Sequence, residues 1–440
     1  MDPYTTCTPL PLDLDCTTCA SILALLLAGY LGQHYLPPPK PRIVGIDLGT
    51  TYSCIAVYHA VTGEVQVIEL DNHDTIPSMV AFTPEGTELV GYSALCQAEQ
   101  NVVNTIYDAK RFIGKRFTPE KLKEEASRYS FKVKLQVDND LATFEVNSQV
   151  VSPEYIGSRI ILHLKEKGER QLGVTVDKVV ISVPADFDEL QRNYTRAAAQ
   201  LAGLEVLRII NEPTAAAMAY GLHNQRTPSE IIVVDMGGGT LDVSLLRVHG
   251  GMFQTLAMAG NNHLGGQDIN HRLVQYLCDL IAMKYSKPVL NVRELQNLRL
   301  AVEDVKLNLT NHESSLLQLP LPSLGDHVIF TENITREMFE HLNEDLFQKV
   351  LEPIRLVIEE VEMTPDDIDE VVLVGGSTRI PRVRQVVGDF FGKVPNVEVD
   401  PELAVVYGVA IQAGIIGGMW PLQVSAIEIH NTKVKKIRVT

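Results

Sequence analysis

Cysteine is scarce in this chain, and the few cysteines present are not spaced as a metal or redox site requires. Six occur among 440 residues, and Cys16 and Cys19 form the one Cys-x-x-Cys pair. A structural zinc site would need a second pair, or a histidine at the usual spacing, and the sequence has neither. We therefore interpret the thiols as buried or idle.

Positive charge is in deficit as well. The chain has 38 Lys and Arg residues against 55 Asp and Glu residues, which gives a formal net charge of −17. Nucleic acids and anionic membranes attract basic surfaces, so this balance argues against either as the main partner. A nucleotide, which is also anionic, would need local compensation from Lys110, glycine amides and a cation.

The N-terminal segment, which we call the leader, lacks an apolar run long enough to span a bilayer. Residues 20–31 are mostly apolar, but this stretch is too short to span a membrane and suits the apolar core of a secretory signal. Against a signal, residues 1–19 contain no Lys or Arg. We favour a signal or signal-anchor, with a buried helix or an alternative start as the other interpretation. Three Asn-x-Thr sequons are compatible with secretion: Asn193, Asn308 and Asn333.

The rest of the chain divides into two halves. A stiff proline-rich spacer ends at residue 41, and a polar connector runs over residues 221–230. Hydrophobic residues make up 45% of the chain, enough to build two or more domains. We expect a leader and spacer over 1–41, a first lobe over 42–225 with an insertion at about 76–152, a second lobe over 226–418 with an insertion at about 264–335, and a short tail over 419–440.

Each half contains a strand–turn–strand segment suited to an anion. Residues 45–58 (GIDLGTTYSCIAVY) and 233–246 (VVDMGGGTLDVSLL) run from an apolar strand through an aspartate into a turn of glycines and threonines. Glycine lets the backbone approach a ligand closely, and successive N–H groups in such a turn bind anions. Two copies, led by Asp47 and Asp235, predict two facing loops that grip one polyphosphate with a metal between them.

A second repeated feature supports a duplicated architecture. The apolar strands VVISV, from Val179, and VVLV, from Val371, occupy corresponding places in the two halves, and each precedes a turn and a helical pattern. Continuous apolar strands are covered on both faces, which is typical of α/β layers. We expect two α/β lobes with a cleft where the hairpins face each other.

The second insertion contains a helical pattern with a polar face. Its apolar positions keep helical spacing: Leu295, Leu298, Val302, Val305 and Leu309. This spacing gathers Glu303, Lys306 and Thr310 on a different face. A solvated surface is the simple interpretation of that face, and a ligand contact is the alternative.

Two further residues could take part in phosphoryl chemistry. Lys110 lies in the basic segment DAKRFIGKRF, and Glu212 follows the strand VLRII at its carboxyl end, where α/β folds bind ligands. Hydrolysis of a nucleoside triphosphate needs positive charge and a positioned water beside the transferred group. Taken alone, Lys110 would be a surface lysine and Glu212 part of a helix N-cap.

Six ordered motifs together resemble one family. They are GIDLGTTYS, DAKRFIG, NEPTAAAMAYG, VVDMGGGTLDVSLL, HLGGQDIN and VVLVGGSTRIPRV. In this order they closely resemble the nucleotide-binding domain of the stress-70 (70-kDa heat-shock) chaperones, over residues 43–418. The resemblance implies an actin-like ATPase fold: two lobes around Mg-ATP, each with an RNase-H-like core and an inserted subdomain.

The resemblance also implies roles for particular residues. Lys110 would lie at the γ-phosphate and the attacking water, Glu212 would orient water, and Asp47 and Asp235 would reach Mg²⁺ through water. Thr240 completes the implied catalytic set. The implied nucleotide contacts are Gly49, Thr50, Thr51, Tyr52, Gly237, Gly238, Gly239, Gly266, Glu303, Lys306, Thr310, Gly375, Gly376, Ser377 and Arg379. The implied cofactors are ATP or ADP with Mg²⁺, and K⁺ is a candidate additional cation.

The chain also departs from the family pattern. Leu307 follows Lys306 where the family commonly has an arginine that stacks on adenine. Asp186 replaces a usual aromatic residue, and Glu402 a usual aspartate. After Gly418 only 22 residues remain, so we expect neither the family's leucine-rich linker nor its peptide-binding domain. A stand-alone core with an apolar leader is similar to the microsomal branch of the family, associated with the endoplasmic reticulum. A leader that is not a working signal would mean a cytoplasmic protein.

We expect an ATPase core that hydrolyses Mg-ATP to ADP and phosphate without a peptide-binding domain. Its expected partners are the nucleotide and another protein of the co-chaperone or exchange-factor type, with no nucleic acid, and we expect a monomer. Three rival functions remain open. They are a nucleotide-sensing adaptor that does not hydrolyse ATP, a sugar or acetate kinase on the same scaffold, and an actin-like filament.

Overall fold

The computed structural model describes residues 21–29, 40–136, 138–224, 227–285, 290–325, 327–418, 427–429 and 436–438. The chain forms two units, residues 1–40 and residues 41–440. In the first unit, residues 21–29 form a helix whose side chains are all exposed. Cys16 and Cys19 lie outside the described residues. Of the helices that the structure describes, none has both the length and the apolar character that crossing a bilayer demands.

The first half of the larger unit is built on a mixed sheet. Its path is β12-β11-β1-β2-β3, and β4 pairs with β2. β1 is parallel to β11 and antiparallel to β2. The strands are β1 (Ile43–Leu48), β2 (Tyr52–His59), β3 (Glu64–Val67), β4 (Ile76–Pro77), β11 (Lys178–Val183) and β12 (Glu205–Asn211). The side chains of β1 and β11 are mostly buried, as their continuous apolar sequence predicts.

Two helices cover this sheet, and their ends follow from local sequence. α4 (Pro153–Leu172) begins where the Ser152 side chain accepts a hydrogen bond from the Tyr155 N–H, and it ends at Gly173 with φ 64°. α5 (Glu189–Leu201) begins with a capping box between Asp188 and Gln191. The apolar faces of these helices pack with the sheet into the first hydrophobic core.

The second half repeats this plan. Its sheet follows the path β18-β13-β14-β15-β19, with β20 also paired to β15. The strands are β13 (Ser229–Met236), β14 (Leu241–His249), β15 (Met252–Asn261), β18 (Glu370–Val374), β19 (Ile427–Ile429) and β20 (Lys436–Arg438). β13 is parallel to β18 and antiparallel to β14, just as β1 is parallel to β11 and antiparallel to β2. The structure therefore confirms the predicted α/β architecture.

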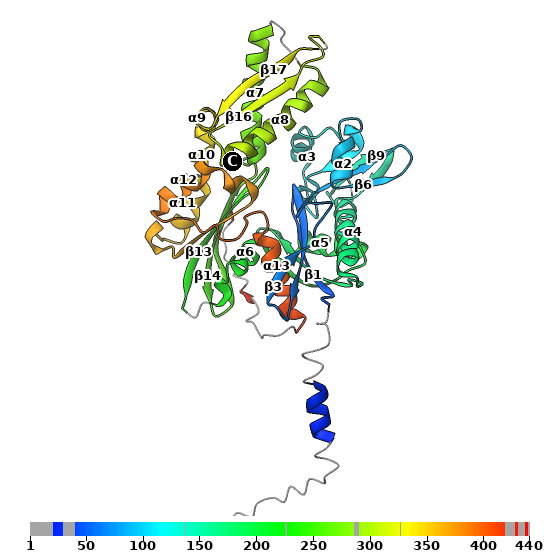
Figure 1. Ribbon diagram of the computed structural model, residues 1–440, viewed down its shortest axis with the longest axis vertical. Helices are drawn as coiled ribbons and strands as arrows, with labels where there is room; N and C mark the ends of the chain where they lie inside the picture. The colour runs from blue at the N-terminus through cyan, green and yellow to red at the C-terminus, as the bar shows by residue number, and fades with distance from the viewer. Residues whose placement is uncertain are drawn as a thin grey trace, which may run out of the picture. The chain divides into compact units, whose positions relative to one another are not determined.

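The strands lie in separate lobes in Figure 1, and two helices lie between them. α6 (Glu212–Ala219) and α13 (Ala404–Ile416) pack against each other, and α13 also packs against β1 and β2 of the first lobe. Small residues allow this close approach, because a Cβ added to Gly45 of β1 would come within 2.6 Å of the Ala410 backbone nitrogen. Their apolar side chains form a junction core with residues of both sheets.

Most of the remaining elements lie in the two predicted insertions. The first includes β5 (Met79–Phe82), β6 (Glu88–Val90), α2 (Tyr92–Gln97), η1 (Val102–Asn104), β7 (Thr105–Tyr107), η2 (Ala109–Arg111), α3 (Pro119–Ala126), β8 (Lys132–Leu135), β9 (Ala142–Val146) and β10 (Gln149–Val151). The second includes α7 (Gly266–Tyr285), α8 (Val292–Asn311), β16 (Ser314–Pro320) and β17 (Ile329–Thr335). Beyond it follow α9 (Arg336–Leu342), α10 (Glu344–Lys349), α11 (Leu351–Glu360) and α12 (Pro381–Phe391). The limits of lobes, insertions and tail stay a prediction.

The tail contains two strands that the sequence analysis did not predict. β19 and β20 both pair in parallel with β15, and so cover the edge of the second sheet. The Glu428 carboxylate of β19 also accepts a hydrogen bond from the Asn211 N–H at 2.8 Å. Asn211 ends β12 and directly precedes Glu212, so the tail touches both lobes.

Candidate functional site

A cavity of about 1700 Å³ lies between the two lobes, at the turns of the two hairpins. The β1–β2 turn supplies Thr50 and Thr51 from one side, and the β13–β14 turn supplies Gly237–Thr240 from the other. The two turns lie close together, since a Cβ added to Gly238 would come within 2.8 Å of the Thr51 hydroxyl oxygen. The structure thus brings the two predicted loops face to face.

Hydrogen bonds fix the shape of both turns. The Ser78 hydroxyl donates to the Gly49 carbonyl at 2.8 Å, which holds the first turn against β4. In the second turn, the Gly237 N–H donates to the Thr240 carbonyl at 3.0 Å. The first turn presents hydroxyl groups, whereas the second presents the backbone N–H groups of Gly238 and Gly239. Both kinds of donor suit phosphate oxygens.

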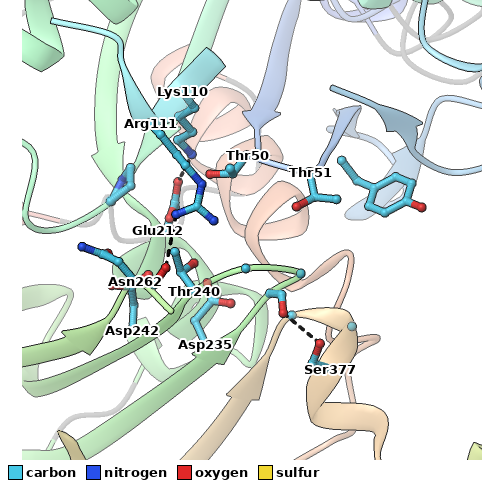
Figure 2. A pocket seen from close by; sticks show the side chains of 18 of the residues that line it. Thr50, Thr51, Lys110, Arg111, Glu212, Asp235, Thr240, Asp242, Asn262 and Ser377 are labelled. Carbon is cyan, nitrogen blue, oxygen red and sulfur yellow. Dashed lines mark hydrogen bonds and ion pairs between the residues drawn. The ribbon is translucent and has the colours of Figure 1, made fainter. Parts of the chain in front are cut away.

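A buried ion pair lies at the deep end of the cleft. The Lys110 ammonium of η2 donates to the Glu212 carboxylate at the start of α6 at 2.5 Å, and the two side chains point toward each other in Figure 2. Burial disfavours the charged form of Lys110, but Glu212, Asp47 and Asp235 offset it, so the pKa of Lys110 lies above its ordinary value. Lys110 therefore stays cationic at neutral pH, and it is not the surface lysine that its sequence context allowed.

Several carboxylates share this end of the cleft with Lys110 and Arg111. Burial raises the pKa of Asp47, Glu212, Asp235 and Asp242, and repulsion between the carboxylates adds to the effect for the last three. For Asp242, burial and repulsion from Asp186 and Glu212 raise the pKa to about 7. The deep end of the cleft is therefore short of positive charge.

This donor set fits a magnesium ion bound largely through water. The described residues contain no group of three or more His, Cys, Asp or Glu side chains placed to ligate one ion directly. Mg²⁺ commonly keeps several waters and uses one or two carboxylates together with substrate phosphates. Asp47, whose carboxylate accepts a hydrogen bond from Ser182 at 2.8 Å, and Asp235 at the end of β13 are the residues placed to hold such a hydrated ion.

The second lobe supplies the outer wall of the cleft. Glu303, Lys306 and Thr310 of α8 line the cavity, while the apolar positions Leu298, Val302, Val305 and Leu309 are buried. The predicted division of this helix into two faces is therefore confirmed. Lys306 donates to Glu303 at 2.7 Å. The polar face lines the cleft, and a ligand contact of these residues stays a prediction.

The turn after β18 completes this wall. Gly375 has φ 83°, and a Cβ there would come within 2.3 Å of the Met236 carbonyl, so only glycine fits. The Ser377 hydroxyl donates to the Gly237 carbonyl at 2.8 Å, which ties this turn to the glycine loop. Arg379 binds the carboxylates of Asp400 and Glu402. These contacts leave the loop rigid on the side opposite Lys110.

Nearly all of the predicted site residues line this one cavity. They are Asp47, Gly49, Thr50, Thr51, Tyr52, Lys110, Glu212, Asp235, Gly237, Gly238, Gly239, Thr240, Glu303, Lys306, Thr310, Gly375, Gly376, Ser377 and Arg379. Gly266 is the exception: its N–H donates to the Gly237 carbonyl at 3.1 Å, and a Cβ there would come within 2.6 Å of the Ser377 hydroxyl oxygen. Gly266 thus supports the glycine loop.

Sequence reasoning missed several residues that the cleft also contains. Arg111 reaches across to the second lobe, where it donates to the Asn262 carbonyl at 3.5 Å, and Asp242 lies beside Asp235 in the β13–β14 ladder. Figure 2 shows Arg111, Asn262 and Asp242 grouped near Glu212. The basic segment DAKRF pointed to Arg111. Asp242 could have been found because it is an acidic residue among apolar ones directly after the glycine turn.

Two α/β lobes that close two glycine–threonine hairpins around a cationic lysine and several carboxylates define an actin-like nucleotide-binding fold. The sequence profile described as Hsp70 protein matches residues 43–434. The chain belongs to the Hsp70 family, and the fold is that of the family's nucleotide-binding domain.

Individual relatives agree with the family. The chain is 53% identical to Heat shock 70 kDa protein 13 of Rattus norvegicus over 462 aligned positions, which cover 95% of this chain and 97% of the rat protein. The proteins of the same name from Homo sapiens and Mus musculus are 53% and 52% identical, with the same coverage. The likeness thus extends over nearly the full length of these relatives.

Proposed function

We propose that this chain is a stand-alone Hsp70-type ATPase core that binds Mg-ATP between its lobes and hydrolyses it to ADP and phosphate. The observation that carries the proposal is the buried Lys110–Glu212 pair opposite the glycine loop. A cationic lysine and a carboxylate beside two turns suited to phosphate are the groups that γ-phosphoryl transfer to water needs.

The chain's own residues account for the main steps. Thr50, Thr51 and the N–H groups of Gly238 and Gly239 hold the β- and γ-phosphates, and Glu303, Lys306 and Ser377 hold the nucleoside end. Mg²⁺, when bound beside Asp47 and Asp235, would neutralise charge on the phosphate oxygens. Lys110 stabilises the negative charge that develops on the γ-phosphoryl oxygens. Glu212 accepts a hydrogen bond from the attacking water, which displaces the β–γ bridging oxygen.

A nucleotide-sensing adaptor is the second candidate function, and one observation favours it. Leu307 lines the cleft on the nucleoside side and is 54% exposed. A cation at this position could stack on a base, and a leucine cannot, which lowers the affinity by about 0.5–2 kcal/mol. Weaker nucleotide binding would suit slow turnover in a protein that mainly reports lobe closure to a partner.

Finer features of the function are also proposals. We infer that the chain enters the endoplasmic reticulum through its apolar leader, acts as a monomer and meets a partner protein of the co-chaperone or exchange-factor type. K⁺ remains a candidate additional cation. The nucleotide cycle would drive contacts between the lobes and that partner.

Steady-state ATP hydrolysis by the purified chain tests the proposal. We expect free phosphate from the wild type, and a loss of about 10²-fold or more in Lys110→Ala, because one preorganised charge at the transition state contributes that much. Lys123→Ala, which removes an exposed lysine from α3, is the matched control. Nucleotide binding without turnover in the wild type would favour the adaptor, and phosphate on an added sugar or acetate would favour a kinase.

A further inference from the structure

The β16–β17 hairpin has an exposed face on which a sequon lies beside an aliphatic side chain. Its side chains alternate between a buried face and an exposed face. On the exposed face, Leu316 is 60% exposed and Ile329 is 56% exposed. Asn333 is exposed on the same face and lies directly opposite Leu316 in the ladder. Opposed side chains in a sheet have their Cβ atoms about 5 Å apart, so a group attached to Asn333 would lie against Leu316.

We propose that Asn333 is an N-glycosylation acceptor whose glycan covers the exposed Leu316 side chain. The Asn333 Nδ2 atom would lose one proton and form a bond to the anomeric carbon of an oligosaccharide, and the polyprenyl diphosphate that carries the oligosaccharide would leave. A bulky, solubilising group fits a surface position beside exposed aliphatic side chains. The proposal rests on the proposed entry into the secretory lumen and is independent of ATP hydrolysis.

The other two sequons are less suited to a glycan in the folded protein. The Asn193 side chain on α5 accepts a hydrogen bond from Arg196 at 2.5 Å. The Asn308 amide on α8 donates to the Ser315 hydroxyl of β16 at 3.4 Å. In the part of the chain that the structure describes, no hydrogen bond holds the Asn333 carboxamide.

Thr335, the third residue of the sequon, provides a matched control. It is exposed at the N-cap of α9, where its hydroxyl accepts a hydrogen bond from the Met338 N–H at 3.2 Å. Serine can replace threonine both in a sequon and at an N-cap. Thr335→Ser therefore keeps the acceptor sequence and the helix start, whereas Thr335→Ala removes both and Asn333→Gln removes only the acceptor.

The test is translation of the full chain in the presence of endoplasmic-reticulum microsomes, with protease protection and endoglycosidase digestion as readouts. We expect a protease-protected wild-type chain with an endoglycosidase-sensitive mass increase of one glycan. The increase should vanish in Asn333→Gln and Thr335→Ala and persist in Thr335→Ser, Asn193→Gln and Asn308→Gln. Mass spectrometry of the peptide that contains Asn333 should locate the glycan.

Three results would overturn the proposal. A protected wild-type chain without a glycan would show that Asn333 is not modified, and a glycan that persists in Asn333→Gln would assign the modification to another sequon. A wild-type chain that stays accessible to protease would show that Asn333 never meets the transferase. ATP turnover by the same purified chain is measured separately, so a failure of either proposal can be told from a failure of the other.

Discussion

The two hairpin turns of the cleft have the same backbone plan but different chemistry. The β1–β2 turn presents the hydroxyl groups of Thr50 and Thr51, while the β13–β14 turn presents the N–H groups of Gly238 and Gly239. Around the first turn lie Lys110 and Glu212, which we assign to the chemical step. The second lobe surrounds its turn with groups that we assign to the nucleoside.

The two halves of a duplicated fold can therefore take different roles. One lobe would set the rate of hydrolysis, and the other would set nucleotide affinity. The division can be tested by changing one lobe at a time and measuring kcat and nucleotide Kd separately. A substitution in one lobe that changes both kcat and Kd would contradict this division between the lobes.

The largest effect is expected in the first lobe, for Glu212→Gln. The change replaces the charged acceptor of the attacking water with a neutral amide oxygen and removes the negative charge that partners the buried Lys110, so kcat should fall by about 10²-fold or more. The Kd for ATP should change little, because the nucleoside is held by the other lobe. Single-turnover hydrolysis and titration with a fluorescent nucleotide measure the two quantities. A large change in Kd with an unchanged kcat would contradict the division.

A smaller effect of the opposite kind is expected for Lys306→Met in the second lobe. The change removes a cation from the wall of the cleft and the partner of Glu303, so nucleotide affinity should fall about 10-fold, as loss of one charge-assisted hydrogen bond would produce. The rate at saturating ATP should stay near the wild-type value. Lys349→Met on α10, an exposed lysine remote from the cleft, is the control. A fall in kcat as large as that in affinity would argue against a purely nucleoside role.

A gain of affinity of several-fold is expected for Leu307→Arg. A guanidinium at this position could stack on the base and make the free energy of nucleotide binding more favourable by about 0.5–2 kcal/mol. Leu300→Arg is a close control, because Leu300 is also on α8, is 46% exposed and does not line the cleft. Isothermal titration with ATP and ADP measures the gain. An equal gain in both variants would mean that added charge, rather than base stacking, is responsible.

The hairpins could be predicted from sequence because their chemistry is local. A run of apolar residues, an aspartate and a glycine turn specify a strand, its end and a close approach within about a dozen residues. Helical periodicity likewise predicted a polar face on α8, but it did not predict which way that face points. The structure resolves that direction toward the cleft.

The features that could not be predicted from the sequence depend on contacts between distant segments. The pairing of Lys110 with Glu212 joins η2 to α6, and the approach of Arg111 to Asn262 joins the two lobes. The tail strands β19 and β20 are short and carry charged residues, so their pattern alone does not predict strands. The open edge of β15 supplies the hydrogen bonds that order them.

The connector between the lobes should respond to pH. His223 in η3 (Leu222–Asn224) is buried, and burial lowers the pKa of its imidazole. The unfolded chain then binds a proton more readily than the folded one, so stability present above pH 6.5 should be lost as pH falls below it. We expect a loss on the order of 1 kcal/mol. Urea unfolding should show a flatter pH profile in His223→Phe than in His312→Phe, which alters an exposed histidine. Parallel profiles would contradict this role of His223.

The smallest effect is expected where the tail meets the first lobe, at Glu428. Glu428→Gln replaces a charged acceptor of the Asn211 N–H with a neutral one of the same shape, and should cost about 0.5–1 kcal/mol of stability. Because Asn211 precedes Glu212, a looser strand end should also change kcat by about two-fold while Kd stays constant. Glu398→Gln, an exposed glutamate in the second lobe, is the control. A change in Kd with kcat unchanged would place the tail with the nucleoside lobe instead, since the contact would then act through β15 rather than through Asn211.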